Sequence, residues 1–185
     1  MIYAILARDK NNLIGDGLSL PWLGDEKTKW DMENFKRLTT ENIVFMGYKT
    51  FLGFKSPLPN RINVVETHNF SGVSPLRDSG HFESLTQTGF IFTKNLGDFL
   101  SEYELQLKTS WKSKKIFIIG GAKTFSKHCE KIDFLYLTTF FSEYKNGETY
   151  LPKDFLSNFK LKKTLESHEN GKIELLENLK SGKVF

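Results

Sequence analysis

The run KIFII at residues 115–119 is the feature that most restricts what this chain can fold into. It is continuously apolar and β-prone, which is typical of parallel strands that are buried on both faces. Gly120 and Gly121 follow it directly and open a segment with helical spacing that extends to about Glu130. A strand that turns tightly into a helix is a building unit of α/β sheets. We therefore expect an α/β protein.

Further strand-like runs are spread along the chain. Apolar and β-branched runs predict strands at residues 1–7, 42–47, 62–67, 90–93 and 134–140. In the tail, Asn170-Gly171 separates two more strand-like segments, and Asn-Gly favours the tight turns that join antiparallel strands. The sequence therefore predicts a mostly parallel central sheet that ends in a C-terminal antiparallel hairpin.

Helices are expected on the faces of this sheet. Asp25 stands where a helix N-cap would, and helical spacing continues to Thr39; a second helix is predicted from Asn95 to about Lys108. Residues 68–89 show little periodicity and are expected to form a long surface excursion. A length of 185 residues fits one domain, so we expect a single α/β domain over residues 1–185.

Composition narrows the functional class. The chain has 26 Lys and Arg against 22 Asp and Glu, scattered without a basic stripe, which mildly favours small anionic partners and argues against nucleic acid. The single cysteine, Cys129, excludes an internal disulfide and cannot build a thiolate metal site alone, so a cytoplasmic protein without metal is expected. No run approaches the ~18 apolar residues of a membrane span, so no membrane partner is expected.

Four acids crowd residues 25–33, and their positions suggest different roles. Asp25 and Glu26 lie in the first turn of the expected helix, where negative charge complements the helix dipole. Asp31 shares a face with Phe35 at i+4, which aims a carboxylate at an apolar surface, whereas Glu33 points elsewhere. Spacing alone leaves a second interpretation open, in which Asp31 is a surface acid paired with Arg37 or Lys27.

The glycine pair also has two interpretations. Residues without side chains at the start of a helix let a phosphate approach free backbone N–H groups. A Gly pair between strand and helix is also ordinary turn chemistry, and IGGAKTF does not match the GxGxxG pattern.

The order of short motifs resembles the dihydrofolate reductase family from residue 1 to about 152. The matching motifs, in the family's order, are MIYAILA, LIG, LPW, DMENFKRLT, IVFMGYKTF, PLPNR, IFIIGGAKTF, LYLTTF and GETYLP. The resemblance implies reduction of 7,8-dihydrofolate to tetrahydrofolate by hydride transfer from NADPH, in a monomer.

Carried over residue by residue, the resemblance assigns roles at the substrate. Asp31 would face the pterin and polarise it for protonation at N5, braced by Thr138. Leu20 and Trp22 would belong to a loop that closes over the nicotinamide. Arg61 would grip the glutamate carboxylate of the substrate. The apolar floor and walls would be Ile5, Met32, Phe35, Phe54 and Ile119.

The resemblance also places the cofactor at the carboxyl ends of the strands. Its diphosphate would lie near the glycine pair and near Lys49 and Thr50. The full set expected to bind it is Ala7, Ile14, Gly15, Lys49, Thr50, Thr67, His68, Gly120, Gly121, Ala122, Lys123, Thr124 and Phe125.

Two departures from the family bear on the cofactor. Tyr48 stands where many members carry a basic residue, which removes one partner of the 2′-phosphate. Lys49, His68 or Lys94 would replace it, or the preference for NADPH over NADH is relaxed. Phe125 stands where a Tyr is frequent.

Other functions also stay open at this point. One is the related pyrimidine reductase of riboflavin biosynthesis, which shares the fold and the glycine pair. The other is a catalytically silent protein that binds folate or nucleotide.

Overall fold

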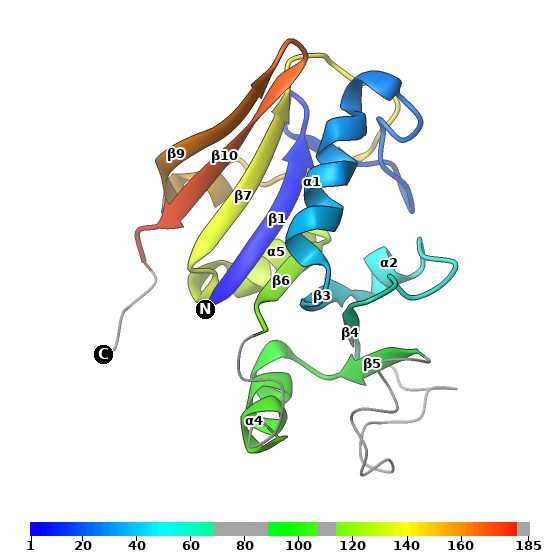
Figure 1. The fold of residues 1–185 in the computed structure, drawn as a ribbon, viewed down its shortest axis with the longest axis vertical. Helices are drawn as coiled ribbons and strands as arrows, with labels where there is room; N and C mark the ends of the chain where they lie inside the picture. The colour runs from blue at the N-terminus through cyan, green and yellow to red at the C-terminus, as the bar shows by residue number, and fades with distance from the viewer. Residues whose placement is uncertain (69–88, 107–113, 181–185) are drawn as a thin grey trace.

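The computed structural model describes residues 1–68, 89–106 and 114–180 (Figure 1). The expected surface excursion at 68–89 therefore lies, apart from its two end residues, outside the described residues. The end of the helix expected to reach Lys108 lies outside them as well.

An eight-stranded sheet forms the centre of the fold, in the order β5-β4-β3-β6-β1-β7-β10-β9. The first six strands in this order run parallel, while β10 is antiparallel to both β7 and β9. Their bounds are β1 (Ile2–Arg8), β3 (Ile43–Gly47), β4 (Ile62–Glu66), β5 (Phe90–Thr93), β6 (Ile116–Gly120), β7 (Phe134–Phe140), β9 (Phe159–His168) and β10 (Gly171–Asn178). The predicted α/β class, the mostly parallel sheet and the C-terminal hairpin are confirmed.

A second, two-stranded sheet pairs β2 (Leu13–Gly15) with β8 (Thr149–Tyr150). No sequence pattern predicts this sheet, because strands of three and two residues show no periodicity. It fastens the segment after β1 to the segment after β7, and the Glu148 amide donates to the Gly15 carbonyl at 3.2 Å.

The helices cover both faces of the sheet. They are α1 (Lys29–Thr39), α2 (Tyr48–Phe51), α4 (Leu96–Gln106) and α5 (Ala122–His128), with 3₁₀ turns η1 (Glu26–Thr28), η3 (Cys129–Lys131) and η4 (Phe155–Asn158). In Figure 1, α1 crosses in front of β1 and β6, and α5 lies behind them. Alternate residues of β1 follow this division: Tyr3 and Ile5 pack on the α1 side, Ala4 and Leu6 in the core that contains Phe125 of α5.

The helix expected to run from Asp25 to Thr39 is divided in two. Asp25 is an N-cap as predicted, with its carboxylate accepting from the Lys27 amide at 3.0 Å, but the helix it caps is the 3₁₀ turn η1. The Thr28 hydroxyl donates back to the Asp25 carbonyl at 2.8 Å, and α1 begins only at Lys29. The residues between Trp22 and Asp31 therefore form a capped 3₁₀ turn rather than an extra turn of α1.

The parallel strands bring their carboxyl ends to one edge of the sheet. In the register, Gly47 of β3 is opposite Glu66 of β4, and Glu66 is opposite Thr93 of β5. Ala7 of β1 is opposite Thr138 of β7. Ligands of parallel α/β sheets bind at this edge, where successive crossovers diverge to opposite sides. Within the described segments, every helix is too short or too polar to cross a lipid bilayer.

Candidate active site

Asp31 is the acid of α1 that faces the protein. Its side chain is 7% exposed, while Glu33, two positions on, is exposed. Burial raises the pKa of Asp31 to about 6, although a hydrogen bond from the Thr138 side chain works in the opposite direction. Arg37 instead donates to Asn34 and to Glu166. The interpretation of Asp31 as a surface acid paired with Arg37 or Lys27 is therefore wrong.

Apolar side chains form two clusters on the face of the sheet that α1 covers. Ile5, Phe35 and Ile119 pack in one cluster with Tyr3 and Phe117. Ile119 also joins a second cluster, in which Phe54 packs against Val44, Met46 and Val65 of neighbouring strands. Ile5, Phe35, Phe54 and Ile119 therefore lie in two apolar clusters joined through Ile119, and Met32 of α1 is 41% exposed.

Arg61 lies beside the Phe35 ring of the first cluster and is 8% exposed, so it is not the solvated loop residue that its sequence context alone indicates. Its guanidinium donates to the Pro59 carbonyl at 3.0 Å and to the Thr39 hydroxyl at 3.0 Å, and it lies 5.9 Å from the centre of the Phe35 ring. These contacts fix the guanidinium against the wall, and a planar guanidinium matches a carboxylate with two parallel hydrogen bonds.

Trp22 lies in the loop between β2 and η1. Its ring is 2% exposed and packs 4.9 Å from the Phe140 ring and 5.7 Å from the Tyr144 ring. Its indole Nε1 is buried and has no hydrogen-bond partner within the described part of the chain. A buried donor of this kind carries a desolvation cost unless a ligand or water accepts from it.

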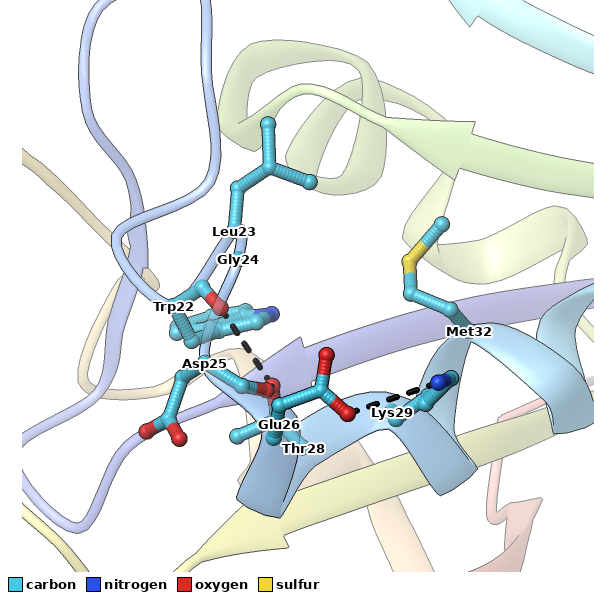
Figure 2. Close-up of a pocket in the computed structure, with 8 residues that line it drawn as sticks. All are labelled: Trp22, Leu23, Gly24, Asp25, Glu26, Thr28, Lys29 and Met32. Carbon is cyan, nitrogen blue, oxygen red and sulfur yellow. Dashed lines mark hydrogen bonds and ion pairs between the residues drawn. The ribbon is translucent and has the colours of Figure 1, made fainter.

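A small cavity of about 130 Å³ lies between this loop and α1. Figure 2 shows the nitrogen edge of the Trp22 ring turned to the side of Met32. The lining residues are Trp22, Leu23, Gly24, Asp25, Glu26, Thr28, Lys29 and Met32. The loop therefore presents a hydrogen-bond donor and apolar atoms to this cavity, while Leu20 is half-buried earlier in the same loop.

The loop is also tied to the segment after β7. The Tyr144 hydroxyl donates to the second carboxylate oxygen of Asp25 at 3.0 Å, so Asp25 both caps η1 and holds Tyr144. Burial and the neighbouring Asp25 carboxylate raise the pKa of Tyr144 to about 12. Trp22 is thereby enclosed between Phe140 and Tyr144.

The glycine pair sits where β6 turns into α5. Gly120 has a φ of +140°, a conformation that favours glycine, and the Gly120–Gly121 peptide is cis. A Cβ on either glycine would lie 3.2 Å from the Thr50 hydroxyl oxygen, and a Cβ on Gly47 would overlap the Thr124 hydroxyl. The glycines therefore let the ends of β3 and β6, α2 and α5 approach closely.

The other expected cofactor residues are distributed around this turn. Thr124 and Phe125 are buried on α5, Ala122 is half-buried, and Lys123 is exposed. Ile14 and Gly15 lie on β2, where Ile14 packs against the core on the α5 side of the sheet. Thr67 is buried directly after β4 and His68 is exposed.

Lys49 takes part in an ion pair at the surface. Its ammonium pairs with Glu148 at 3.7 Å, and both side chains are about two-thirds exposed. Tyr48, beside it, is 43% exposed and packs on Phe51.

Polar groups that the sequence analysis did not single out also surround the site. Glu66 at the end of β4 is buried with His128 of α5, and Thr39 holds Arg61. A glutamate at the end of the buried strand INVVE was the available indication of a buried acid. In the described ranges, no group of three His, Cys, Asp or Glu side chains is placed to hold a metal ion.

Fold and site together place the chain among α/β enzymes that bind small molecules at the carboxyl edge of a parallel sheet. The family model described as "Dihydrofolate reductase" matches residues 1–177. The chain belongs to the dihydrofolate reductase family.

Curated relatives agree with this assignment. The dihydrofolate reductase of Mycoplasma pneumoniae is 32% identical over 171 residues, covering 91% of this chain and 93% of that protein. The dihydrofolate reductase of Bacillus subtilis is 33% identical over 161 residues, covering 87% and 81%. The bifunctional dihydrofolate reductase-thymidylate synthase of Paramecium tetraurelia is 33% identical over 171 residues, but this chain spans only 32% of its length.

A solved structure shares the fold. It is the dihydrofolate reductase from Enterococcus faecalis complexed with NADP(H) and RAB-propyl, with a TM-score of 0.71 and 24% identity, covering 97% of this chain and 96% of that one. The expected family and its oxidoreductase activity are confirmed by these comparisons, which give no support to a pyrimidine reductase or to a silent binding protein.

Proposed function

We propose that Asp31 is the acid that orients and polarises 7,8-dihydrofolate while the chain reduces it to 5,6,7,8-tetrahydrofolate. The observation that carries this proposal is a buried carboxyl with a pKa raised to about 6, on an apolar wall at the sheet edge. A carboxylate there accepts hydrogen bonds from the 2-amino group and the adjacent ring N–H of the pterin. This polarises the ring toward protonation at N5, with solvent supplying the proton.

The remaining substrate contacts come from the apolar surface and from Arg61. Ile5, Phe35, Phe54 and Ile119, with Met32 at the rim, hold the pterin and benzoyl rings by burying them. Arg61 holds the glutamate carboxylate, because its guanidinium is already fixed by Thr39 and Pro59 at the end of that surface. The substrate is thus bound by burial along its rings and by charge at its two ends.

The residues around the glycine pair suit NADPH by the chemistry of their donors. The hydroxyls of Thr50 and Thr124, the backbone N–H groups of residues 121–124 and the ammonium of Lys123 can hold the diphosphate. Ala7, Ile14 and Ile119 flank the nicotinamide, with Gly15 and Phe125 nearby, and Thr67 and His68 meet the adenosine end. When bound, NADPH supplies the hydride that adds to C6 of dihydrofolate.

The loop that carries Leu20 and Trp22 excludes water from the reacting atoms. Trp22 brings a buried N–H that has no partner in the described protein, and a substrate acceptor or a bridging water can take it. Asp25 and Tyr144 hold this loop against the segment after β7.

We further propose that residues 1–185 form a single domain that acts as a cytoplasmic monomer. The family match over residues 1–177 and the single cysteine of the chain support this. A measurement of the mass of the protein in solution tests whether it is a monomer.

The test of the reaction is the fall in absorbance of the reduced nicotinamide when dihydrofolate is added with NADPH, and then with NADH. A fall with NADPH supports the proposed function, and the ratio of the two rates measures the cofactor preference. No fall in absorbance with either cofactor would contradict the proposed function.

A further inference from the structure

The carboxyl ends of β3, β4 and β5 place one group of residues together. Gly47, Glu66 and Thr93 are in register across these three strands. They are followed in the chain by Tyr48, Thr67 and Lys94, at the edge where the adenosine end of NADPH is placed above. Tyr48 brings no positive charge to this edge.

Lys127 of α5 brings a positive charge to the end of β4. The Lys127 ammonium lies 3.0 Å from a carboxylate oxygen of Glu66, the last residue of β4, and the Lys127 side chain is 44% exposed. His128 meets the same Glu66 oxygen through Nε2 at 2.9 Å, from a position that is 4% exposed. Burial alone would raise the pKa of Glu66, but hydrogen bonds from His128 and Lys127 outweigh it and leave the pKa below its ordinary value.

Resting on the function proposed above, we propose that Lys127 is the specificity-determining residue that binds the 2′-phosphate of NADPH. The Glu66 carboxylate contacts the Lys127 ammonium at the end of β4, so this side chain is already ordered and loses less conformational entropy when a phosphate binds. An ammonium has three N–H donors, and the contact with Glu66 uses one of them. Lys127 takes the place of the basic residue that Tyr48 does not supply.

The carboxylate of Glu66 does not favour NADH at this edge. An acid at the end of a strand can bind a ribose 2′-hydroxyl and repel a 2′-phosphate. Here Glu66 is 8% exposed and is turned toward the buried His128, which itself packs edge-on at 5.7 Å from the Phe45 ring. Its charge is thus directed into α5, and its effect at the edge is to anchor Lys127.

Lys49 is less suited to this role. Its ammonium pairs with Glu148. Glu148 directly precedes β8, the strand that pairs with β2, and lies in neither β4 nor β5. The Lys49 ammonium is therefore held near the small sheet of β2 and β8.

The test compares Lys127→Met, Lys127→Arg and the control Lys131→Gln, which removes an exposed cation one helical turn further on. For each protein, binding of 2′,5′-ADP and of 5′-ADP is measured by calorimetry, alongside KM for NADPH and for NADH. We expect Lys127→Met to weaken 2′,5′-ADP and to raise KM for NADPH roughly tenfold, with 5′-ADP and NADH unchanged. Lys127→Arg should retain most of the preference, and Lys131→Gln all of it.

Equal loss of 2′,5′-ADP and 5′-ADP binding in Lys127→Met would overturn the proposal, because the residue would then act on the fold of α5 rather than on the phosphate. Unchanged binding of both nucleotides would also overturn it. The nucleotide comparison does not need turnover, so a failure of dihydrofolate reduction in the wild-type chain would contradict the proposed function and leave this test of Lys127 intact.

Discussion

The side chain of Thr138, on β7, hydrogen-bonds the carboxyl of Asp31, on α1. The bond joins a helix on one face of the sheet to a strand in its centre, so the position of the acid is set by two elements far apart in the chain. Thr138 is 2% exposed and Asp31 is 7% exposed, so the bond forms away from bulk water, where it is strengthened electrostatically.

Replacing this acid should abolish most turnover without unfolding the protein. Asp31→Asn keeps the size of the side chain and a hydrogen-bond acceptor for Thr138, but it removes the charge that polarises the pterin. We expect kcat/KM with dihydrofolate to fall about 100-fold or more. The matched control is Asp25→Asn, because Asn also caps helices: its oxygen can still accept from the Lys27 amide and its NH2 group can donate to the Tyr144 hydroxyl oxygen, so it should stay active. If Asp31→Asn were as active as the wild type with dihydrofolate, the role proposed for Asp31 would be wrong.

The same substitution should stabilise the protein at neutral pH. Burial raises the pKa of Asp31 from 3.8 to about 6, so the native state favours the protonated acid more than the unfolded chain does. The stability from this group is fully present below about pH 4 and is lost as pH rises through about 6. Asp31→Asn lacks this loss, so we expect its free energy of unfolding to exceed that of the wild type by roughly 1–3 kcal/mol near pH 8. Urea denaturation at pH 8 and pH 4 measures the difference, which should disappear at the lower pH.

Removing the Thr138 hydroxyl should shift the pH dependence of the reaction. The hydrogen bond lowers the pKa of Asp31 against the effect of burial. Thr138→Val is close in size but cannot donate, so the pKa should rise above about 6, and the inflection in the profile of kcat/KM against pH should move to higher pH by roughly one unit. The neighbouring Thr139→Val serves as the control. A profile that stays in place would show that this hydroxyl does not set the charge of Asp31.

The sequence predicted the parallel strands of the main sheet closely because each carries a run of apolar or β-branched residues long enough to be recognised. β5 and β7 begin and end where they were expected, at Phe90–Thr93 and Phe134–Phe140. The pairing of β2 with β8 was missed, because it depends on two loops meeting and not on a local pattern.

For the site, helical spacing correctly aimed Asp31 at the apolar face, but it could not decide between a surface acid and a buried one. Contacts between residues far apart in the chain could not be predicted from local patterns. Nothing near His128 or Tyr144 in the sequence indicates that His128 contacts Glu66 or that Tyr144 contacts Asp25. The division of the first helix into η1 and α1 depends on Thr28 folding back onto Asp25, which a cap preference alone does not predict.

The bond between Tyr144 and Asp25 should stabilise the loop that carries Trp22. Tyr144→Phe removes the donor at 3.0 Å while the other Asp25 oxygen still caps η1. We expect a loss of about 1 kcal/mol in the free energy of unfolding and a blue-to-red shift in Trp fluorescence as the enclosed indole gains water. Tyr150→Phe is the control, since that side chain is 53% exposed. No change in either measurement would mean that the Trp22 ring packing holds the loop without this hydrogen bond.

The buried pair of Glu66 and His128 should be sensitive to the loss of one partner. His128→Phe leaves the carboxylate with Lys127 alone, so we expect a loss of roughly 2 kcal/mol in the free energy of unfolding at pH 7. The double variant Glu66→Leu with His128→Phe replaces both groups by apolar ones and should regain much of that loss. Because the pKa of Glu66 lies below its ordinary value, the stability from the wild-type pair is present above about pH 4.5 and is lost as pH falls through the native pKa. In thermal unfolding measured from pH 7 to pH 3, the wild type should therefore lose stability more steeply than the double variant, and parallel curves would show that Glu66 does not contribute in its ionised form.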